Sequence, residues 1–212
     1  VVQTSEGKLL LGAITGWLLF GVTILVTGYV DEKSGLLLSG ITAAHIVFGR
    51  AAGISVGFAM DAGLWTVVLL NMLIEALLVL LAYPIFVLGW KKLYTFEWFD
   101  NWMHKAHANA RKYRPVIAQY GVYGLFAFVW FPFWMTGPVV GSMIGFLMGL
   151  SHRMTLLVVL GSTFLAVFCW ALLLMGVQEW ATDIDPRAPW IIVGIIISAA
   201  VLMTLRRNNR QH

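Results

Sequence analysis

The sequence contains runs of apolar residues that are too long and too free of charge for a water-soluble fold. The windows 9–30 and 154–177 contain no Asp, Glu, Lys or Arg, and about 20 apolar residues are enough for a helix to cross a bilayer. Of the 212 residues, 60% are hydrophobic and 11% are charged, whereas soluble domains carry about 25% charged residues. The chain is therefore an integral membrane protein. The alternation of a membrane barrel is missing, so an all-α fold is predicted.

The rest of the composition excludes several classes of function. Cys169 is the single cysteine, which rules out an intrachain disulfide and a thiolate metal cluster. The net charge is +4, and in a membrane protein a basic excess is typical of cytoplasmic loops rather than of nucleic-acid binding. The polar start, 1–8, leads straight into a full-length span, so no cleavable signal peptide is expected.

Two of the apolar stretches are interrupted. Stretch 36–60 carries Arg50 at its middle, and stretch 122–150 is broken by prolines and glycines. Proline and glycine weaken the interior of a helix, and each half of 122–150 is too short to cross the bilayer alone. We expect both stretches to be re-entrant helical hairpins, which enter the membrane and return on the same side.

The distribution of basic residues supports this topology. With a cytoplasmic N-terminus and two re-entrant stretches, eleven of the 14 Lys and Arg residues fall on the cytoplasmic side. Only Lys33 and Arg187 fall outside, and Arg50 remains in the membrane. The positive-inside rule therefore favours this arrangement. We predict a multi-pass protein of the cell inner (plasma) membrane, with both termini in the cytoplasm.

The order of the segments resembles a repeat within a single polytopic membrane domain, 1–212. We predict about four transmembrane helices and two hairpins: a first span at 9–30, a hairpin and span at 36–90, an amphipathic cytoplasmic linker helix at 91–121, a second hairpin and span at 122–177, and a last span at 190–205. One crossing separates the two hairpin-and-span units, so they enter from opposite sides, as in the inverted repeats of secondary transporters. The residue-level similarity between the units is weak, so this expectation rests on segment order.

The segments FGRAAGISVGFAMDAGLWTVVLLNMLIEALLVLLAYPIF (48–86) and ARKYRPVIAQYGVYGLFAFVWFPFWMTGPVVGSMIGFLMGLSHRMTLLVVLGSTFLAVF (110–168) resemble the two halves of the small multidrug export protein family. That family is distantly similar to DedA-type (VTT-domain) membrane proteins, which are thought to move lipids. The resemblance implies a transporter or a lipid-handling protein. The family usually has an acidic residue two positions before the arginine, where this chain has Phe48, and a proline soon after it, which this chain lacks.

Arg50 and Glu75 are the main candidates for chemistry. A charge inside the membrane is expensive and is tolerated beside a cavity, an acid or an anionic ligand. Arg50 is therefore either a site for an anionic headgroup or carboxylate, or a structural cation that pairs with Glu75 or snorkels to the surface. Glu75 is either a proton or cation site or a structural acid, and Asn71 lies one helical turn before it. His45 lies five residues before Arg50, off its helical face, and is expected to be a satisfied interior histidine.

The tip of the second hairpin completes the predicted binding site, with Pro132, Thr136, Gly137 and Pro138. The expected partners are membrane lipids and an anionic or amphipathic solute, with no nucleic acid. No catalytic residue and no cofactor are predicted, so the chain is not expected to be an enzyme. Phe48 and the extra terminal spans favour an alternative, a non-catalytic accessory subunit of a larger membrane complex. Self-association into a homo-oligomer is also compatible with the sequence.

A weaker alternative is a metal-dependent membrane enzyme. Glu97, Asp100, His104 and His107 follow one another at spacings of 3, 4 and 3 residues, which places four metal-binding residue types on one helix face. Adjacent pairs such as Asp100 and His104 could share one ion. Polar faces of surface helices often look like this, so no metal is predicted.

Overall fold

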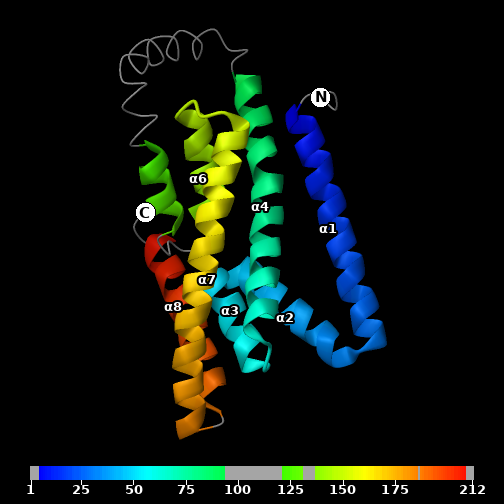
Figure 1. Cartoon of the computed structure of the whole chain (residues 1–212), viewed down its shortest axis with the longest axis vertical. Coiled ribbons are helices and arrows are strands. Elements are labelled where there is room, and N and C mark those ends of the chain that lie inside the picture. Colours follow the sequence, from blue (N-terminus) through cyan, green and yellow to red (C-terminus); the bar gives the residue numbers. More distant parts are fainter. Residues whose placement is uncertain (1–4, 94–120, 131–136, 186, 209–212) are drawn as a thin grey trace. The chain divides into compact units, whose positions relative to one another are not determined.

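The computed structural model describes residues 5–93, 121–130, 137–185 and 187–208, and the secondary-structure elements in these ranges are helices. In chain order they are α1 (Ser5–Val30), α2 (Glu32–Phe48), α3 (Arg50–Ala59), α4 (Leu64–Leu93), the helix Gly121–Trp130, α6 (Gly137–Leu147), α7 (His152–Ile184) and α8 (Ala188–Asn208). Figure 1 shows them coloured along the chain. The predicted all-α fold is confirmed for these residues.

Three of the described helices are long and apolar enough to cross a bilayer. They cover Ser5–Val30, Leu64–Gly89 and His152–Ile184, which are the predicted spans 9–30, 62–90 and 154–177. The predicted last span, 190–205, falls on α8, whose segment Ala188–Ala199 belongs with the shorter apolar helices. The fourth span therefore stays a prediction. Most of the predicted linker, 94–120, lies outside the described residues.

The chain forms two compact units. Unit 1 comprises Val1–Leu18 and Ala76–Thr163, and unit 2 comprises Leu19–Glu75 and Phe164–His212. The long helices α1, α4 and α7 each contribute one part to each unit. Each unit has an apolar core of its own, with Val79, Leu125, Val129 and Val159 in unit 1 and Ile54, Val67, Val68, Val167, Ala171 and Leu174 in unit 2.

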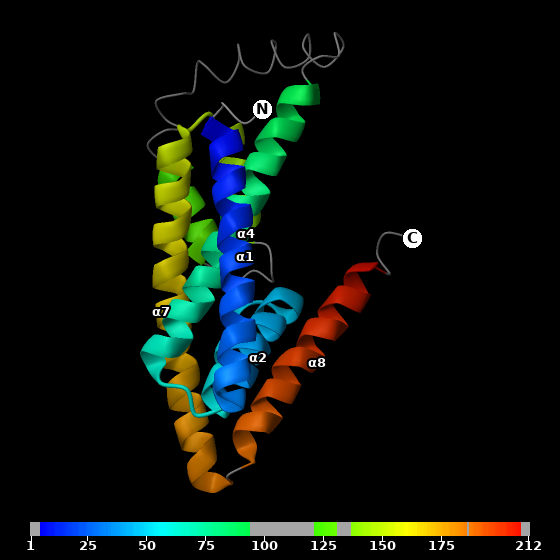
Figure 2. The ribbon, with the colours of Figure 1, turned by 90° about the vertical axis from the view of Figure 1, so that its right-hand side faces the viewer.

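In unit 2, α2 and α3 form an antiparallel hairpin. Gly49 separates the two helices with φ 88°, a left-handed backbone conformation that glycine adopts without steric cost. A Cβ atom on Gly53 would lie 2.9 Å from Cβ of His45, and one on Gly57 would lie 3.2 Å from Cδ1 of Ile41. The glycines thus allow the two helices to pack closely. α8 packs against α3 in the same unit (Figure 2).

Unit 1 contains a second hairpin, between the helix Gly121–Trp130 and α6. A Cβ atom on Gly141 would overlap the side chain of Val129, and one on Gly145 would lie 3.1 Å from Cδ2 of Leu125. These contacts run in opposite directions along the two helices, so the hairpin is antiparallel. Residues 131–136, between the helices, lie outside the described residues.

The turn that leads from each hairpin into the following long helix has the same structure in both units. Four backbone hydrogen bonds of the first turn recur 88 residues later in the second, among them Ala62 N to Gly57 O and Leu150 N to Gly145 O. Asp61 and Gly149, which occupy the same place in these turns, both have positive φ. The segments 49–60 and 137–148 share three glycines at a spacing of four, followed by Phe and Met. The weak similarity expected between the units is therefore concentrated in this segment.

Candidate functional site

A buried cluster of polar side chains lies where the α2–α3 hairpin meets α4 in unit 2. Arg50 is the first residue of α3, directly after the turn at Gly49. Its side chain is only 7% exposed, so it does not snorkel out of the fold. Because the helix breaks at Gly49, the guanidinium is placed beside α4 rather than along the axis of α2.

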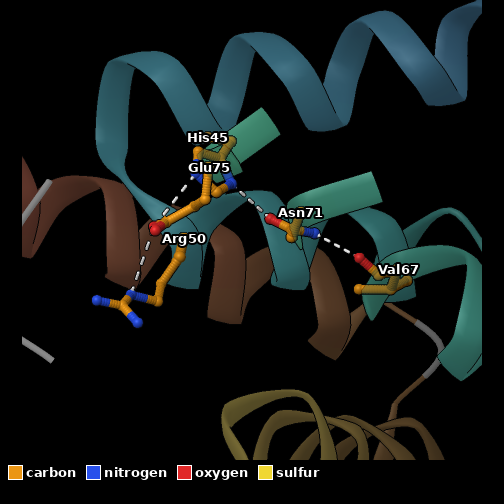
Figure 3. Close-up of polar contacts among 5 residues, drawn as sticks. All are labelled: His45, Arg50, Val67, Asn71 and Glu75. Atoms are coloured by element: carbon orange, nitrogen blue, oxygen red, sulfur yellow. Dashed lines mark hydrogen bonds and ion pairs between the residues drawn. The ribbon is translucent and has the colours of Figure 1, made fainter. Parts of the chain in front are cut away.

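Glu75 is the centre of this cluster (Figure 3). Its Oε1 atom lies 3.7 Å from Nε of Arg50 and 3.5 Å from Nε2 of His45. Glu75 is 7% exposed, and burial of a carboxylate is tolerated when opposite charges compensate it. Of the structural alternatives for Arg50, the ion pair with Glu75 is the one present.

Asn71 connects His45 to the backbone of α4. Its Oδ1 lies 2.7 Å from Nδ1 of His45, and its Nδ2 donates a hydrogen bond to the carbonyl oxygen of Val67 at 2.8 Å. Asn71 is fully buried and His45 is 3% exposed. The predicted residues Arg50, Asn71 and Glu75 are thus brought together, and His45 joins them.

The expectation that His45 is a satisfied interior histidine is confirmed, since it is 3% exposed and pairs with Asn71. Its place beside Arg50 and Glu75 was missed, because the spacing to Arg50 was measured along a continuous helix. Gly49 interrupts that helix, so a separation of five residues says nothing about their relative direction. The partners of His45 come from α4, and Asn71 is 26 residues away. Gly53 allows His45 and Asn71 to meet, because it has no side chain. A Cβ atom at this position would lie only 2.6 Å from Oδ1 of Asn71.

Other buried polar atoms of unit 2 are only partly satisfied. Gln178 of α7 donates from Nε2 to the carbonyl oxygen of Ser55 at 3.1 Å. Within the residues that the structure describes, Oε2 of Glu75, Oγ of Ser55 and Oε1 of Gln178 have no hydrogen-bond partner. Buried polar atoms are normally paired, so unpaired ones call for an explanation such as a water, an ion or a ligand.

The remaining predicted residues lie elsewhere or are not described. Gly137 and Pro138 are buried at the start of α6, in unit 1. Pro132 and Thr136 lie outside the described residues, as do Asp100, His104 and His107 of the metal alternative. Among the residues that are described, no group of three or more His, Cys, Asp or Glu could hold a metal ion.

Unit 1 has a histidine cluster of its own. His152 is the first residue of α7. Its Nδ1 lies 2.5 Å from the hydroxyl oxygen of Tyr83, and its Nε2 lies 3.2 Å from Oε1 of Glu6. Tyr83 and Glu6 are buried, and the side chain of His152 is 37% exposed. This cluster connects the starts of α1 and α7 to α4.

A hollow with a volume of about 490 Å³ lies along α7 in unit 1. Its lining comprises the exposed Arg153 followed by apolar residues, namely Leu156, Leu157, Leu160 and Gly161. The hollow therefore joins an exposed cation to an apolar surface on the same helix.

A comparison with models of protein families finds a match. The family model described as "Putative small multi-drug export protein" matches residues 50–169, which includes Arg50, Asn71, Glu75 and both hairpin-to-helix turns. No curated protein and no solved structure matches the chain. The match covers more than half of the chain, and with the three long apolar helices it establishes that the chain is a membrane protein that belongs to the small multi-drug export family.

Proposed function

We propose that the protein is a membrane transporter that moves an anionic or amphipathic solute, with the cluster around Arg50 as its binding site. The observation that carries the proposal is the buried pair of Arg50 and Glu75, whose Oε2 has no hydrogen-bond partner among the described residues. Charged residues inside a membrane protein are expensive, and where they occur they often serve a ligand or an ion pathway. The family's description as an export protein agrees with this use.

The position of Arg50 at the start of α3 suits an anion. The N-terminus of a helix carries unpaired N–H groups and partial positive charge, which favour negative groups. No side chain caps α3. In this proposal an anionic group of the solute replaces Glu75 as the partner of Arg50. Asn71 keeps the neighbouring His45 in position. No catalytic residue and no cofactor take part.

The two hairpins complete the proposed architecture. Each is antiparallel, so both ends of a hairpin lie on the same side of its own unit, as a re-entrant segment requires. The repetition of the turn 57–62 at 145–150 supports an internal repeat, and the single crossing by α4 makes that repeat inverted. We place the protein in the inner membrane with both termini in the cytoplasm, following the charge distribution.

The test compares an anionic with a cationic fluorescent dye, carboxyfluorescein and ethidium, in inside-out membrane vesicles. We expect the protein to move the anionic dye, and Arg50→Gln to slow that movement by about tenfold or more, because a charge-assisted hydrogen bond contributes about 1.5–3 kcal/mol. Arg187→Gln is the matched control, since Arg187 is exposed and no contact with the solute is proposed for it. Equal rates of dye movement for Arg50→Gln and the unmodified protein would show that Arg50 is not part of the binding site.

Lipids are the natural amphipathic solutes for such a site, and the resemblance to DedA-type proteins expected from the sequence would favour them. The hollow beside Arg153 supports contact between α7 and a lipid headgroup. A fluorescent anionic lipid added to one leaflet of the same vesicles tests this version, because a lipid-handling protein would move it to the other leaflet and Arg50→Gln would slow that step.

The second candidate function is that of an accessory subunit. In α1, only 11% of the most apolar window is buried inside the fold, which leaves most of this helix to contact lipid or another protein. Purification in native lipid distinguishes the two functions. A fixed stoichiometry with a larger complex, together with no dye movement, would favour the accessory role over transport.

A further inference from the structure

Asn71 determines which ring nitrogen of His45 carries a hydrogen. The carbonyl of Val67 can only accept a hydrogen bond, so the amide nitrogen of Asn71 must face it, at 2.8 Å. The amide oxygen of Asn71 therefore faces Nδ1 of His45, at 2.7 Å. Because that oxygen can only accept, Nδ1 must be the donor.

The other ring nitrogen then faces Glu75 with a lone pair. In a neutral histidine with hydrogen on Nδ1, Nε2 is an acceptor. It lies 3.5 Å from Oε1 of Glu75, also an acceptor when the carboxyl is ionised. Two acceptors facing each other inside a buried cluster repel, and a single proton between them converts this contact into a charge-assisted interaction.

We propose that His45 and Glu75 share one exchangeable proton between Nε2 and Oε1, and that this pair is a proton-binding site of the protein. The proton is bound when Nε2 takes it up as N–H, and it leaves through the same atom. This proton-binding site lies in unit 2. Asn71 determines that Nε2 is the nitrogen that binds the proton, and Glu75 supplies the negative charge beside it.

Arg50 contacts the same carboxylate oxygen. Its Nε lies 3.7 Å from Oε1 of Glu75. In the proposal, Nε2 of His45 carries the proton, and Oε1 of Glu75 then faces two positive groups. Arg50 of α3, His45 of α2 and Glu75 of α4 are the charged or titratable groups that face the pair among the described residues. α8 packs against α3 and has no titratable side chain from Ala188 to Ala199. Glu179 and Asp183 of α7 are exposed.

The cluster in unit 1 shows that a histidine beside a glutamate does not by itself require an extra proton. At His152 the hydroxyl of Tyr83 can donate to Nδ1, and an N–H at Nε2 can donate to Glu6. Each donor there meets an acceptor while the ring is neutral. The difference is that the partner of Nδ1 is a hydroxyl in unit 1 and an amide oxygen in unit 2. His152 is therefore the internal reference for His45.

This inference deepens the proposed function, on which the coupling role of the proton rests. Binding and release of the proton change the charge of a buried cluster by one unit, next to the proposed contact of the solute with Arg50. Two ligands that bind at one cluster influence each other's affinity reciprocally. A transporter that loads the proton on one face and releases it on the other would thereby use the proton gradient.

The first experiment observes the proton directly, by solid-state NMR of the ring nitrogens in protein with ¹⁵N-labelled histidine, reconstituted in lipid. The chain has five histidines, and the His45 signals are assigned by their loss in His45→Gln. From about pH 4 to about pH 9, a range that brackets ordinary histidine titration, we expect Nε2 of His45 to change between protonated and bare. Nδ1 should stay protonated throughout.

Two variants make this result specific. In Glu75→Gln the amide can donate to Nε2, so the ring should remain neutral and the titration of Nε2 should disappear. Glu6→Gln is the matched control, which should alter the signals of His152 and leave those of His45 unchanged. The proposal is overturned if Nε2 of His45 does not titrate, if Nδ1 titrates instead, or if Glu75→Gln titrates like the unmodified protein.

The second experiment separates this proposal from the proposed function. It measures movement of carboxyfluorescein in the vesicles at several pH values, for the unmodified protein and for His45→Gln. Titration of His45 without movement of carboxyfluorescein would support the proton site and contradict transport. Dye movement with the same pH dependence in both proteins would support transport and overturn the proton site as its coupling group.

Discussion

At the scale of single residues, Asp31 shows how one side chain begins a helix. It lies between α1 and α2 with an extended backbone, and its carboxylate accepts hydrogen bonds from the backbone N–H groups of Lys33 and Ser34. The hydroxyl of Ser34 donates to the same carboxylate. These hydrogen bonds lower the pKa of Asp31 below the ordinary value of 3.8, and the bond from the Ser34 hydroxyl has the largest effect. Asp31 is thus an N-cap of the kind that favours helix initiation.

The lowered pKa predicts how this cap depends on pH. A carboxyl group whose pKa is lower in the folded protein stabilises the fold above its unfolded pKa, and this contribution is lost as the pH falls through the folded value. We expect Asp31→Asn, which keeps an acceptor but cannot ionise, to have a lower Tm than the unmodified protein at pH 7. The difference should shrink as the pH falls below the ordinary value of 3.8, as measured by thermal unfolding in detergent. A difference that is constant with pH would contradict this role.

The residue scale also shows where sequence reasoning reaches its limit. Arg50, Asn71 and Glu75 could be chosen from the sequence because polar side chains inside apolar stretches are rare and expensive. The place of His45 could not, because it depends on the φ of 88° at Gly49 and on contacts with α4. Such contacts arise from the packing of helices, which residue spacing along one helix does not encode. The function of these residues stays a prediction.

At the scale of elements, glycines control how closely the short helices approach their neighbours. In α3, Gly53 faces His45 and Asn71, and Gly57 faces Ile41 and Val67. Small residues at helix interfaces in membranes allow the backbones to approach and to pack. The recurrence of this glycine spacing at 137–145 was visible in the sequence. These glycines mark the internal repeat more clearly than the order of the elements does.

Gly53→Ala is the sharpest test of this packing. The added methyl group would lie 2.6 Å from Oδ1 of Asn71 and 2.9 Å from Cβ of His45, so α3 must shift away from the cluster. Overpacking of this kind reduces the free energy of unfolding by about 1–3 kcal/mol. Gly21→Ala in α1 is the matched control, because no atom lies within 4 Å of its added Cβ. Denaturant unfolding should separate the two variants, and equal stabilities would show that Gly53 is not a packing constraint.

At the scale of the whole molecule, composition was sufficient to identify the class of protein. Long uncharged apolar runs have few structural solutions in a membrane, and three of the described helices have the expected length. The division into two units, each sharing α1, α4 and α7, was not visible in the sequence. A helix that contributes to two cores must be apolar on many faces, so its periodicity does not report which residues belong to which core.

The re-entrant topology is the prediction on which the proposed architecture depends. If both hairpins return to their own side, cysteines replacing Lys33 and Gly63 should react with a membrane-impermeant maleimide from the outer face, and cysteines replacing Tyr123 and Ser151 from the cytoplasmic face. Gly63 has open space around an added Cβ, and Tyr123 is 72% exposed. The exposed Cys169 must first be replaced by serine.

The physical argument for this outcome is the length of the half-helices. α3 has 10 residues, or about 15 Å of helix at the usual rise per residue, which is half of a bilayer core of about 30 Å. α2 is longer, with 17 residues, but α3 is too short to cross alone, so the hairpin that the two helices form can reach the membrane interior only by turning there. Labelling of residues 33 and 63 from opposite faces would mean that α2 and α3 together cross the bilayer, which would place the two repeats in the same orientation and remove the inverted design.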